Sequence, residues 1–118
     1  MPAKLSNEYG SITIDEHVLA TVAGLSAMEC YGLVGMASKG ATEGLFELVK
    51  RENLTKGVKV YTKDNSIIVD LHIVVQFGTK ISVVAKNIIE KVKYNIENLT
   101  GMEVEKVNIY VEGVRVQK

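Results

Sequence analysis

The sequence contains no tryptophan, a single cysteine and no long apolar run, and each of these absences narrows the class of protein. One thiol cannot form an intramolecular disulfide, which favours a reducing cytoplasm over secretion. No apolar stretch approaches the roughly 20 residues needed to span a bilayer. The first residues also lack the apolar segment of a signal peptide. We therefore expect a cytoplasmic protein with no direct membrane insertion.

A net charge is absent as well, since 14 basic side chains balance 14 acidic ones. A neutral chain generates no global field that would draw it to nucleic acid or to an anionic membrane. The 118 residues, of which 47% are hydrophobic, fit one globular domain. Because aromatic residues make up only 6%, Val, Ile and Leu must fill the core, and this composition favours strands.

The start of the chain predicts a strand and a helix after a polar leader, residues 1–9. Residues 10–14 alternate apolar and small polar side chains, as in a short strand. Asp15 is a good N-cap for a helix that runs to about Cys30. The expected apolar stripe of this helix comprises Val18, Leu19, Val22, Ala23 and Leu25.

Glycines interrupt the next segment, residues 32–44, which predicts a loop or a short strand. Residues 45–49 have the apolar content of a short second helix. Two β-type runs follow at 57–63 and 66–77, on either side of Asp64-Asn65, a pair that tolerates the positive φ of tight turns. These runs predict a β-hairpin.

The second run of this hairpin has two different faces. Its odd-numbered positions from Ile67 to Val75 are all apolar and predict the core face. Its even-numbered positions form the other, amphipathic face and comprise Ile68, Asp70, His72, Val74 and Gln76.

A long amphipathic helix is expected next, capped by Thr79 and ended by Gly101. Its apolar stripe recurs at helical spacing and comprises Ile81, Val84, Ala85, Ile88, Val92, Ile96 and Leu99. Residues 104–116 then return as a final strand. Together the patterns predict a single α+β domain at 10–118, with a small mixed sheet, a central β-hairpin and the long helix packed on one face. The order of the strands stays open.

Apolar residues and glycines recur in a distinctive order along the chain. The first half contains Gly10-x-Ile12-x-Ile14, Gly32-Leu33-Val34-Gly35 and Gly57-Val58-Lys59-Val60. The second half contains Val69-x-Leu71-x-Ile73-x-Val75-x-x-Gly78, Leu99-Thr100-Gly101-Met102 and Val107-Asn108-Ile109-x-Val111-x-Gly113-Val114. This order of motifs resembles the alkaline shock protein family of envelope stress response proteins. It covers nearly the whole chain, from Gly10 to Val116, and the chain is most similar to the short, anchorless type.

The resemblance implies a bacterial, cytoplasmic protein linked to alkaline or cell-envelope stress. It also implies, as for some members, recruitment to the inner face of the membrane by a separate anchor protein. It supplies no active site, because the shared positions are apolar residues and glycines of the kind a fold needs. We therefore expect a non-enzymatic binding or scaffolding protein that acts through protein-protein contacts, without catalytic residues, cofactor or metal.

The residues that most often carry chemistry have simpler interpretations in this chain. Asp70 and His72 share a strand face and would give a metal two ligands, but two ligands do not make a site, and His17 is expected far away in the first helical turn. Cys30 has no base beside it in the sequence, so a buried structural thiol is favoured over a nucleophile.

An alternative interpretation is a KH-like nucleic-acid-binding module. Gly32-Leu33-Val34-Gly35 would be its GxxG turn between two helices, in the order strand, helix, helix, strand, strand, helix. The central residues of this turn are apolar, whereas a phosphate backbone favours basic or polar ones, and the chain is neutral. The charge pattern therefore argues against nucleic acid as the partner.

A partner interface is expected on the sheet face that the helices leave open. Ile68, His72 and Val74 lie on that face, and Tyr110 and Val114 are expected to join them from the final strand. A mixed apolar and polar surface suits a reversible contact, and the edge of the final strand offers backbone groups for strand addition. We expect self-association or binding of a membrane-anchor protein, with Tyr110 as the main contact residue.

Overall fold

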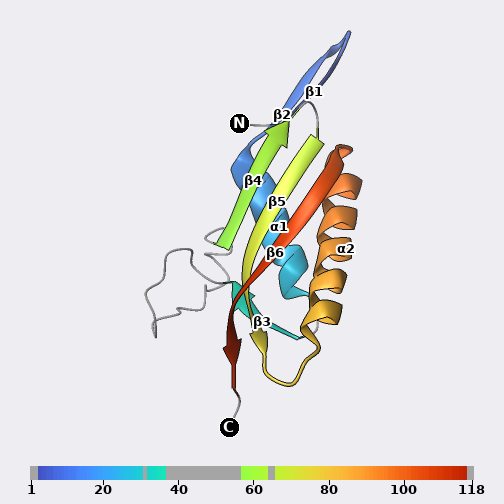
Figure 1. Ribbon diagram of the computed structural model, residues 1–118. Helices are drawn as coiled ribbons and strands as arrows, with labels where there is room; N and C mark the ends of the chain where they lie inside the picture. Colours follow the sequence, from blue (N-terminus) through green and yellow to red (C-terminus); the bar gives the residue numbers. More distant parts are fainter. Residues whose placement is uncertain (1–2, 31, 37–56, 64–65, 117–118) are drawn as a thin grey trace.

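The computed structural model describes residues 3–30, 32–36, 57–63 and 66–116 (Figure 1). Within these ranges the strands are β1 (Ala3–Asn7), β2 (Gly10–Ile14), β3 (Leu33–Met36), β4 (Val58–Lys63), β5 (Ser66–Gln76) and β6 (Glu103–Arg115), and the helices are α1 (Glu16–Met28) and α2 (Ile81–Thr100). The fold is α+β, as the sequence predicts, with one sheet of two strands and one of four. The short helix expected at 45–49 and the hairpin turn at 64–65 lie outside the described residues.

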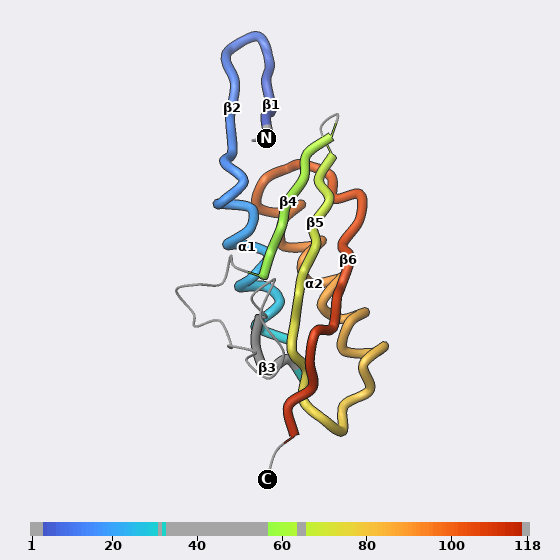
Figure 2. The backbone as a smooth tube through the Cα atoms, turned by 60° about the vertical axis from the view of Figure 1, so that its left-hand side comes forward, coloured from blue at the N-terminus to red at the C-terminus, as the bar shows by residue number. Residues whose placement is uncertain are grey.

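β5 is the centre of the four-stranded sheet and pairs along both of its edges. On one edge, β4 runs antiparallel to residues 66–71 of β5 and β3 runs antiparallel to residues 73–75. On the other edge, β6 runs parallel to β5 along residues 66–76, and Figure 2 shows β4, β5 and β6 side by side. The hairpin and the mixed sheet are therefore confirmed. Because parallel neighbours need a crossover connection, α2 joins β5 to β6.

One face of this sheet carries the core. The odd-numbered positions of β5 from Ile67 to Val75 are at most 1% exposed, as the alternation predicts. They form one cluster with side chains from both helices, among them Leu19, Ala23, Ala27, Val84, Ile88, Val92 and Ile96. Both described helices therefore lie on this face, and neither covers the opposite one (Figure 1).

The buried stripe of α2 is narrower than the sequence predicts. Its buried residues are Val84, Ile88, Val92 and Ile96, which recur at a strict spacing of four. Ile81 and Leu99, at the two ends of the predicted stripe, are 43% and 68% exposed. The middle turns of α2 therefore make its contact with the sheet.

The N-cap of α1 agrees with the prediction, but the residues that this helix buries differ from the predicted apolar stripe. Asp15 is the N-cap, and its carboxylate accepts a hydrogen bond from the backbone N–H of His17 at 3.0 Å. Val18 and Leu25 were expected in the core but are 49% and 37% exposed. The buried positions are mostly small residues that allow close packing and comprise Leu19, Ala20, Ala23, Gly24, Ser26 and Ala27.

Of the two predicted caps of α2, the N-terminal one is wrong and the C-terminal one is confirmed. The expectation that Thr79 caps the helix is wrong, because its hydroxyl donates to the carbonyl of Gln76 at 2.7 Å and Lys80 is the N-cap. Thr79 therefore belongs to the turn that follows β5. The C-terminal end is as predicted: Gly101 has a φ of 76°, and its N–H donates to the carbonyl of Glu97 at 2.9 Å.

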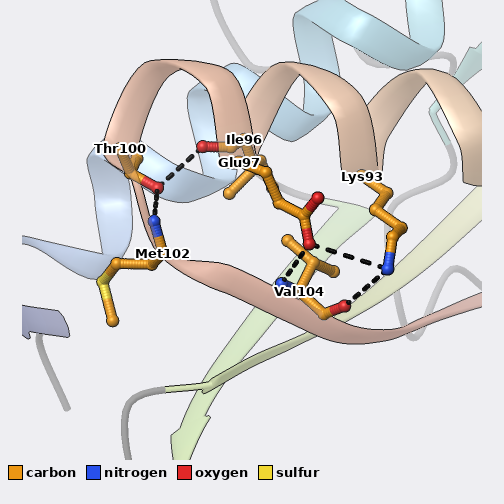
Figure 3. Close-up of polar contacts among 6 residues, drawn as sticks. All are labelled: Lys93, Ile96, Glu97, Thr100, Met102 and Val104. Atoms are coloured by element: carbon orange, nitrogen blue, oxygen red, sulfur yellow. Dashed lines mark hydrogen bonds and ion pairs between the residues drawn. The ribbon is translucent and has the colours of Figure 1, made fainter.

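Side chains of α2 hold the start of β6 (Figure 3). The hydroxyl of Thr100 accepts a hydrogen bond from the N–H of Met102 at 3.1 Å. The Glu97 carboxylate accepts from the N–H of Val104 at 2.9 Å, and the Lys93 ammonium donates to the carbonyl of Val104 at 3.3 Å. Both backbone groups of Val104 are therefore satisfied by the helix that packs beside it.

Residues 3–14 form a hairpin of β1 and β2 that projects from the body of the molecule (Figure 1). The segment 1–9, expected only as a polar leader, thus contains a strand. Leu5 and Ile14 are partly buried against the core, whereas Tyr9 and Ile12 are exposed. Among the described residues, the hairpin therefore contacts the core through Ile14 at its base and through Leu5, which pairs with Ile12 midway along it.

Residues 33–35 of the GxxG sequence lie in a strand and not in a turn. Gly32 has a φ of 92° and leads directly into β3, in which Leu33 pairs with Val75 and Gly35 pairs with Val74. A strand paired with β5 cannot clamp a phosphate backbone in the way a GxxG loop does. The KH-like interpretation therefore loses the feature on which it depends.

Candidate interaction surface

The side of the four-stranded sheet opposite the helices, which we call the open face, takes its side chains from three strands. The register places Lys59 and Tyr61 of β4 beside Asp70 and Ile68 of β5. It places residues 106–112 of β6 along the other side of β5. The side chains of the open face are Lys59, Tyr61, Ile68, Asp70, His72, Lys106, Asn108, Tyr110 and Glu112.

His72 is the best anchored residue of this face. Its ring stacks on that of Tyr110, with 4.8 Å between the ring centroids and 15° between the planes. Its Nδ1 lies 2.7 Å from Oε2 of Glu112. The side chain of His72 is only 13% exposed, so Tyr110 packs against a largely buried ring.

Two tyrosines flank β5 on this face. Tyr61 and Tyr110 are 45% and 46% exposed, and Ile68 lies opposite Tyr61 in the register. Beside them, the side-chain amide of Asn108 donates to the Asp70 carboxylate at 2.9 Å. Exposed aromatic rings set among satisfied polar groups are typical of the residues that dominate protein interfaces.

Of the five residues predicted for the interface, three are partly exposed on the open face, one is buried there and one lies on the other side of the sheet. Ile68, His72 and Tyr110 lie on the open face as predicted. Val74 also lies there by register but is only 4% exposed, at the point where β3 and β6 flank β5 on both sides. It offers almost no surface to a partner.

Val114 does not join Tyr110, because the register of β6 shifts between them. Val111 lies opposite Ile73, but Gly113 lies opposite Val74 and Val114 opposite Val75. The one extra residue in β6 is a bulge, and such an insertion moves every following side chain to the other face. Val114 therefore shares the side of the buried Val75.

Sequence reasoning missed Tyr61 and Glu112 as members of this surface. Tyr61 was predictable from the alternation of β4, which resembles that of β5: the neighbouring Val60 is buried, so Tyr61 belongs to the opposite face. The place of Glu112 on the open face depends on the same bulge that moves Val114 to the other side, and no sequence pattern indicated where this bulge lies.

A cleft of about 570 Å³ lies where the start of α1 meets β4, and its lining includes His17, Lys59, Tyr61 and His72. The structure thus brings the two histidines to one cleft, although the sequence suggested that they lie far apart. In the part of the chain that the structure describes, no group of three or more His, Cys, Asp or Glu residues is arranged to hold a metal ion.

Cys30 has the surroundings of a structural thiol. It is half-buried, and its Sγ lies 3.7 Å from the carbonyl oxygen of Ser26. Burial raises the pKa of the thiol above its ordinary value, an effect that Lys91 opposes and Glu29 reinforces. A raised pKa disfavours the thiolate, which is the nucleophilic form.

The helices of the described ranges include none that is both long and apolar enough to cross a membrane.

Comparison with family models gives a match that spans almost the whole chain. Residues 4–116 match the model of the alkaline shock protein family, which is described as having a cell envelope-related function.

The chain is also similar to curated bacterial proteins over nearly its full length. It is 48% identical to the uncharacterized protein YloU of Bacillus subtilis (strain 168), and the alignment covers 98% of each chain. It is 44% identical to the uncharacterized protein Spy1614 of Streptococcus pyogenes serotype M6, over 98% of this chain and 97% of the other. A stress response regulator gls24 homolog of S. pyogenes serotype M3 is 25% identical over 92% of this chain and 61% of its own length. No solved structure matches the chain.

Proposed function

The chain belongs to the alkaline shock protein family, and from that premise we propose that it is a non-enzymatic binding or scaffolding protein with a cell envelope-related role. It acts through protein contacts made by the open face. The observation that carries this proposal is the exposed ring of Tyr110, which His72 and Glu112 hold in place on a sheet face that no described helix covers.

Two features of the chemistry support a binding role over catalysis. The one thiol has a raised pKa, and the polar groups around His72 are engaged with one another. Preorganisation of this kind lowers the entropy cost of binding, because the contact residues are already ordered. The stress response regulator gls24 homologs among the relatives support a link to stress.

The proposal includes a place in the cell. We propose that the protein is cytoplasmic and is recruited to the inner face of the membrane by a partner, either a membrane-anchor protein or further copies of itself. Such a partner would supply the link to the envelope that the described function of the family calls for. An interface of standard size buries about 800 Å² on each side, and the open face together with its flanking edges is the candidate for that area.

The test is a double variant of the open face in living cells. Ile68→Lys with Tyr110→Glu places two charges in the centre of the proposed contact, while Tyr94→Glu makes the same kind of change at a tyrosine of α2 that is 65% exposed and outside the open face. We expect the double variant to lose its partner in a crosslinked pull-down and to lose any envelope association. The Tyr94→Glu control should keep both.

Thermal melts of the purified variants establish that each is folded, and a parallel pull-down treated with RNase tests the nucleic-acid alternative. If the double variant is folded and still captures the same proteins at the same yield, the open face is not the interface. If capture of every partner disappears on RNase treatment, the protein binds nucleic acid and the proposal is wrong.

A further inference from the structure

β6 has an outer edge whose backbone orientation can be assigned residue by residue. In an extended strand, the side chains and the backbone N–H and C=O groups both alternate sides from one residue to the next. Val104 has its side chain in the core, and its backbone groups turn away from β5, since they bond to Glu97 and Lys93 of α2. The backbone groups of Arg115 point the other way, toward β5, because its carbonyl accepts a hydrogen bond from the N–H of Phe77, just after β5, at 2.9 Å.

Three residues between the two register shifts of β6 have the same backbone orientation as Val104. Val107, Ile109 and Val111 lie opposite the core positions of β5, so their N–H and C=O groups point outward. Among the described residues β6 pairs only with β5, and the bonds from α2 close its outer edge only at Val104. Residues 107–111 therefore form an uncharged run with an open edge, the feature that invites pairing with another strand.

We propose that the occupant of this edge is a second copy of the same chain, whose β6 pairs antiparallel with the first about a two-fold axis through Ile109. The inference rests on the proposed scaffolding function and deepens it, since it names one partner and the surface that binds it. Two-fold pairing is isologous: each residue before Ile109 meets the residue equally far after Ile109 on the other copy. The two four-stranded sheets then become one continuous sheet.

The charges along β6 favour this register. Lys106 and Glu112 each lie three residues from Ile109, so each meets the other across the axis, at two symmetric sites. A two-fold axis moved to Val107 or Val111 would place Lys106 opposite Asn108 or Val116 and lose both pairs. Opposite charges placed directly across an antiparallel pair stabilise it.

The faces of the paired residues agree as well. Val107 would meet Val111, and both lie on the core side, while Asn108 would meet Tyr110 on the open face. Ile109 would meet itself, and the outward backbone groups of residues 107, 109 and 111 would form hydrogen-bonded pairs. The α2 side chains at Val104 mark the end of this ladder.

Charge reversal tests the register in purified protein. Sedimentation velocity is measured over a concentration series for the wild type, for Lys106→Glu, for Glu112→Lys and for the double variant. Each single variant sets like charges opposite each other at two symmetric sites and should weaken the dimer by about tenfold in Kd, whereas the double variant should restore it. Lys106→Glu leaves the contact of Glu112 with His72 in place, so its effect reports on the interface alone.

Amide hydrogen exchange gives a second readout with internal controls. The N–H groups of Val107, Ile109 and Val111 should gain protection as the protein concentration rises, because only the dimer provides them with acceptors. Those of Asn108 and Tyr110, which point toward β5, and that of Val104, which Glu97 holds, should be protected at all concentrations.

A wild type that stays monomeric at all concentrations would overturn the proposal, and so would a dimer whose Kd is unchanged in both single variants. Protection of the three outward amides only on addition of a different protein would assign the edge to that partner and would also overturn it. None of these results overturns the proposed function, which also names a membrane-anchor protein as the partner. Capture of partners through the open face is measured separately, with the variant that combines Ile68→Lys and Tyr110→Glu.

Discussion

The side-chain amide of Asn95 on α2 donates a hydrogen bond to the hydroxyl of Ser26 on α1 at 2.7 Å. Ser26 is only 2% exposed, and its hydroxyl in turn donates to the carbonyl of Val22 at 2.7 Å. The two helices are therefore joined by a partly buried hydrogen bond in a region where α1 otherwise presents alanines and a glycine. Such a bond fixes how the helices are aligned, because any other alignment leaves the hydroxyl without its donor.

We predict that Asn95→Ala lowers the free energy of unfolding by about 1 kcal/mol, the net value of a typical intramolecular hydrogen bond. A double-mutant cycle with Ser26→Ala in urea melts should give a coupling energy of about 0.5 to 1.5 kcal/mol. Asn98→Ala, at an exposed position of the same helix, is the matched control and should change stability by less than about 0.5 kcal/mol. A coupling energy near zero would mean that the bond does not join the helices.

The second prediction concerns the packing of α2 on the sheet. Ile88 is 0% exposed in the core cluster, so Ile88→Ala should cost about 2 to 5 kcal/mol by removing buried methylene groups and leaving a cavity. Val83, five residues earlier on the same helix and 49% exposed, provides the control, since Val83→Ala removes little buried area. Denaturant melts measure both. A loss below about 1 kcal/mol at Ile88 would contradict the packing of this stripe.

The third prediction separates backbone strain from steric overlap at two glycines. Gly32 and Gly101 both have positive φ, at 92° and 76°, but a Cβ on Gly32 would lie 2.7 Å from Cγ2 of Val84, whereas a Cβ on Gly101 would meet nothing within 4 Å. Gly101→Ala should therefore cost about 1 to 2 kcal/mol from strain alone. Gly32→Ala should cost about 1 to 3 kcal/mol more from overpacking.

The cause of that extra cost is testable in the Val84→Ala background. Removal of the Cγ2 methyl relieves the overlap, so Gly32→Ala should then cost no more than Gly101→Ala. Equal costs of the two glycine substitutions in the wild-type background would instead show that the approach of Gly32 to α2 is looser than the structure has it.

The central part of this fold was predictable from the sequence because its periodicities are strong and local. The alternation of β5 gives the core face from Ile67 to Val75 without an error, and the stripe of α2 from Val84 to Ile96 is correct over its buried turns. Each pattern reports which side of an element is buried, which is a property of consecutive residues.

The remainder depended on contacts between distant residues or on single-residue irregularities. That β6 runs parallel to β5 follows from the crossover of α2, and no residue of β6 records it. The bulge after Val111 inverts the face of Val114, and a pattern of period two cannot locate such an insertion. β1 was missed because Leu5 alone among its described side chains is partly buried against the core, which leaves almost no alternation to detect.

The fourth prediction follows from the raised pKa of Cys30. Above pH 9.0, the ordinary value of a thiol, the unfolded chain loses a proton that the folded protein still holds, so stability falls as pH rises through the interval up to the folded-state pKa. Urea melts of the wild type and of Cys30→Ala should differ by a constant amount below about pH 8. Above pH 9.0 the wild type should lose stability relative to Cys30→Ala. A difference that stays constant to about pH 11 would contradict the burial of the thiol.

The last prediction concerns the hairpin of β1 and β2, which projects from the body of the molecule (Figure 2). Two strands without a third are marginally stable in water, and among the described side chains of this hairpin Ile14, at its base, and Leu5, midway along it, pack against the core. We therefore expect its amide hydrogens near Tyr9 and Ile12 to exchange by local opening, at a lower free energy than the amides of β5, which exchange only on global unfolding. Leu5→Ala should speed exchange throughout the hairpin, while Tyr9→Ser, at a position 90% exposed, should leave it unchanged. Protection of the hairpin equal to that of β5 in dilute protein would mean that the arm is anchored along its whole length, which contradicts the structure.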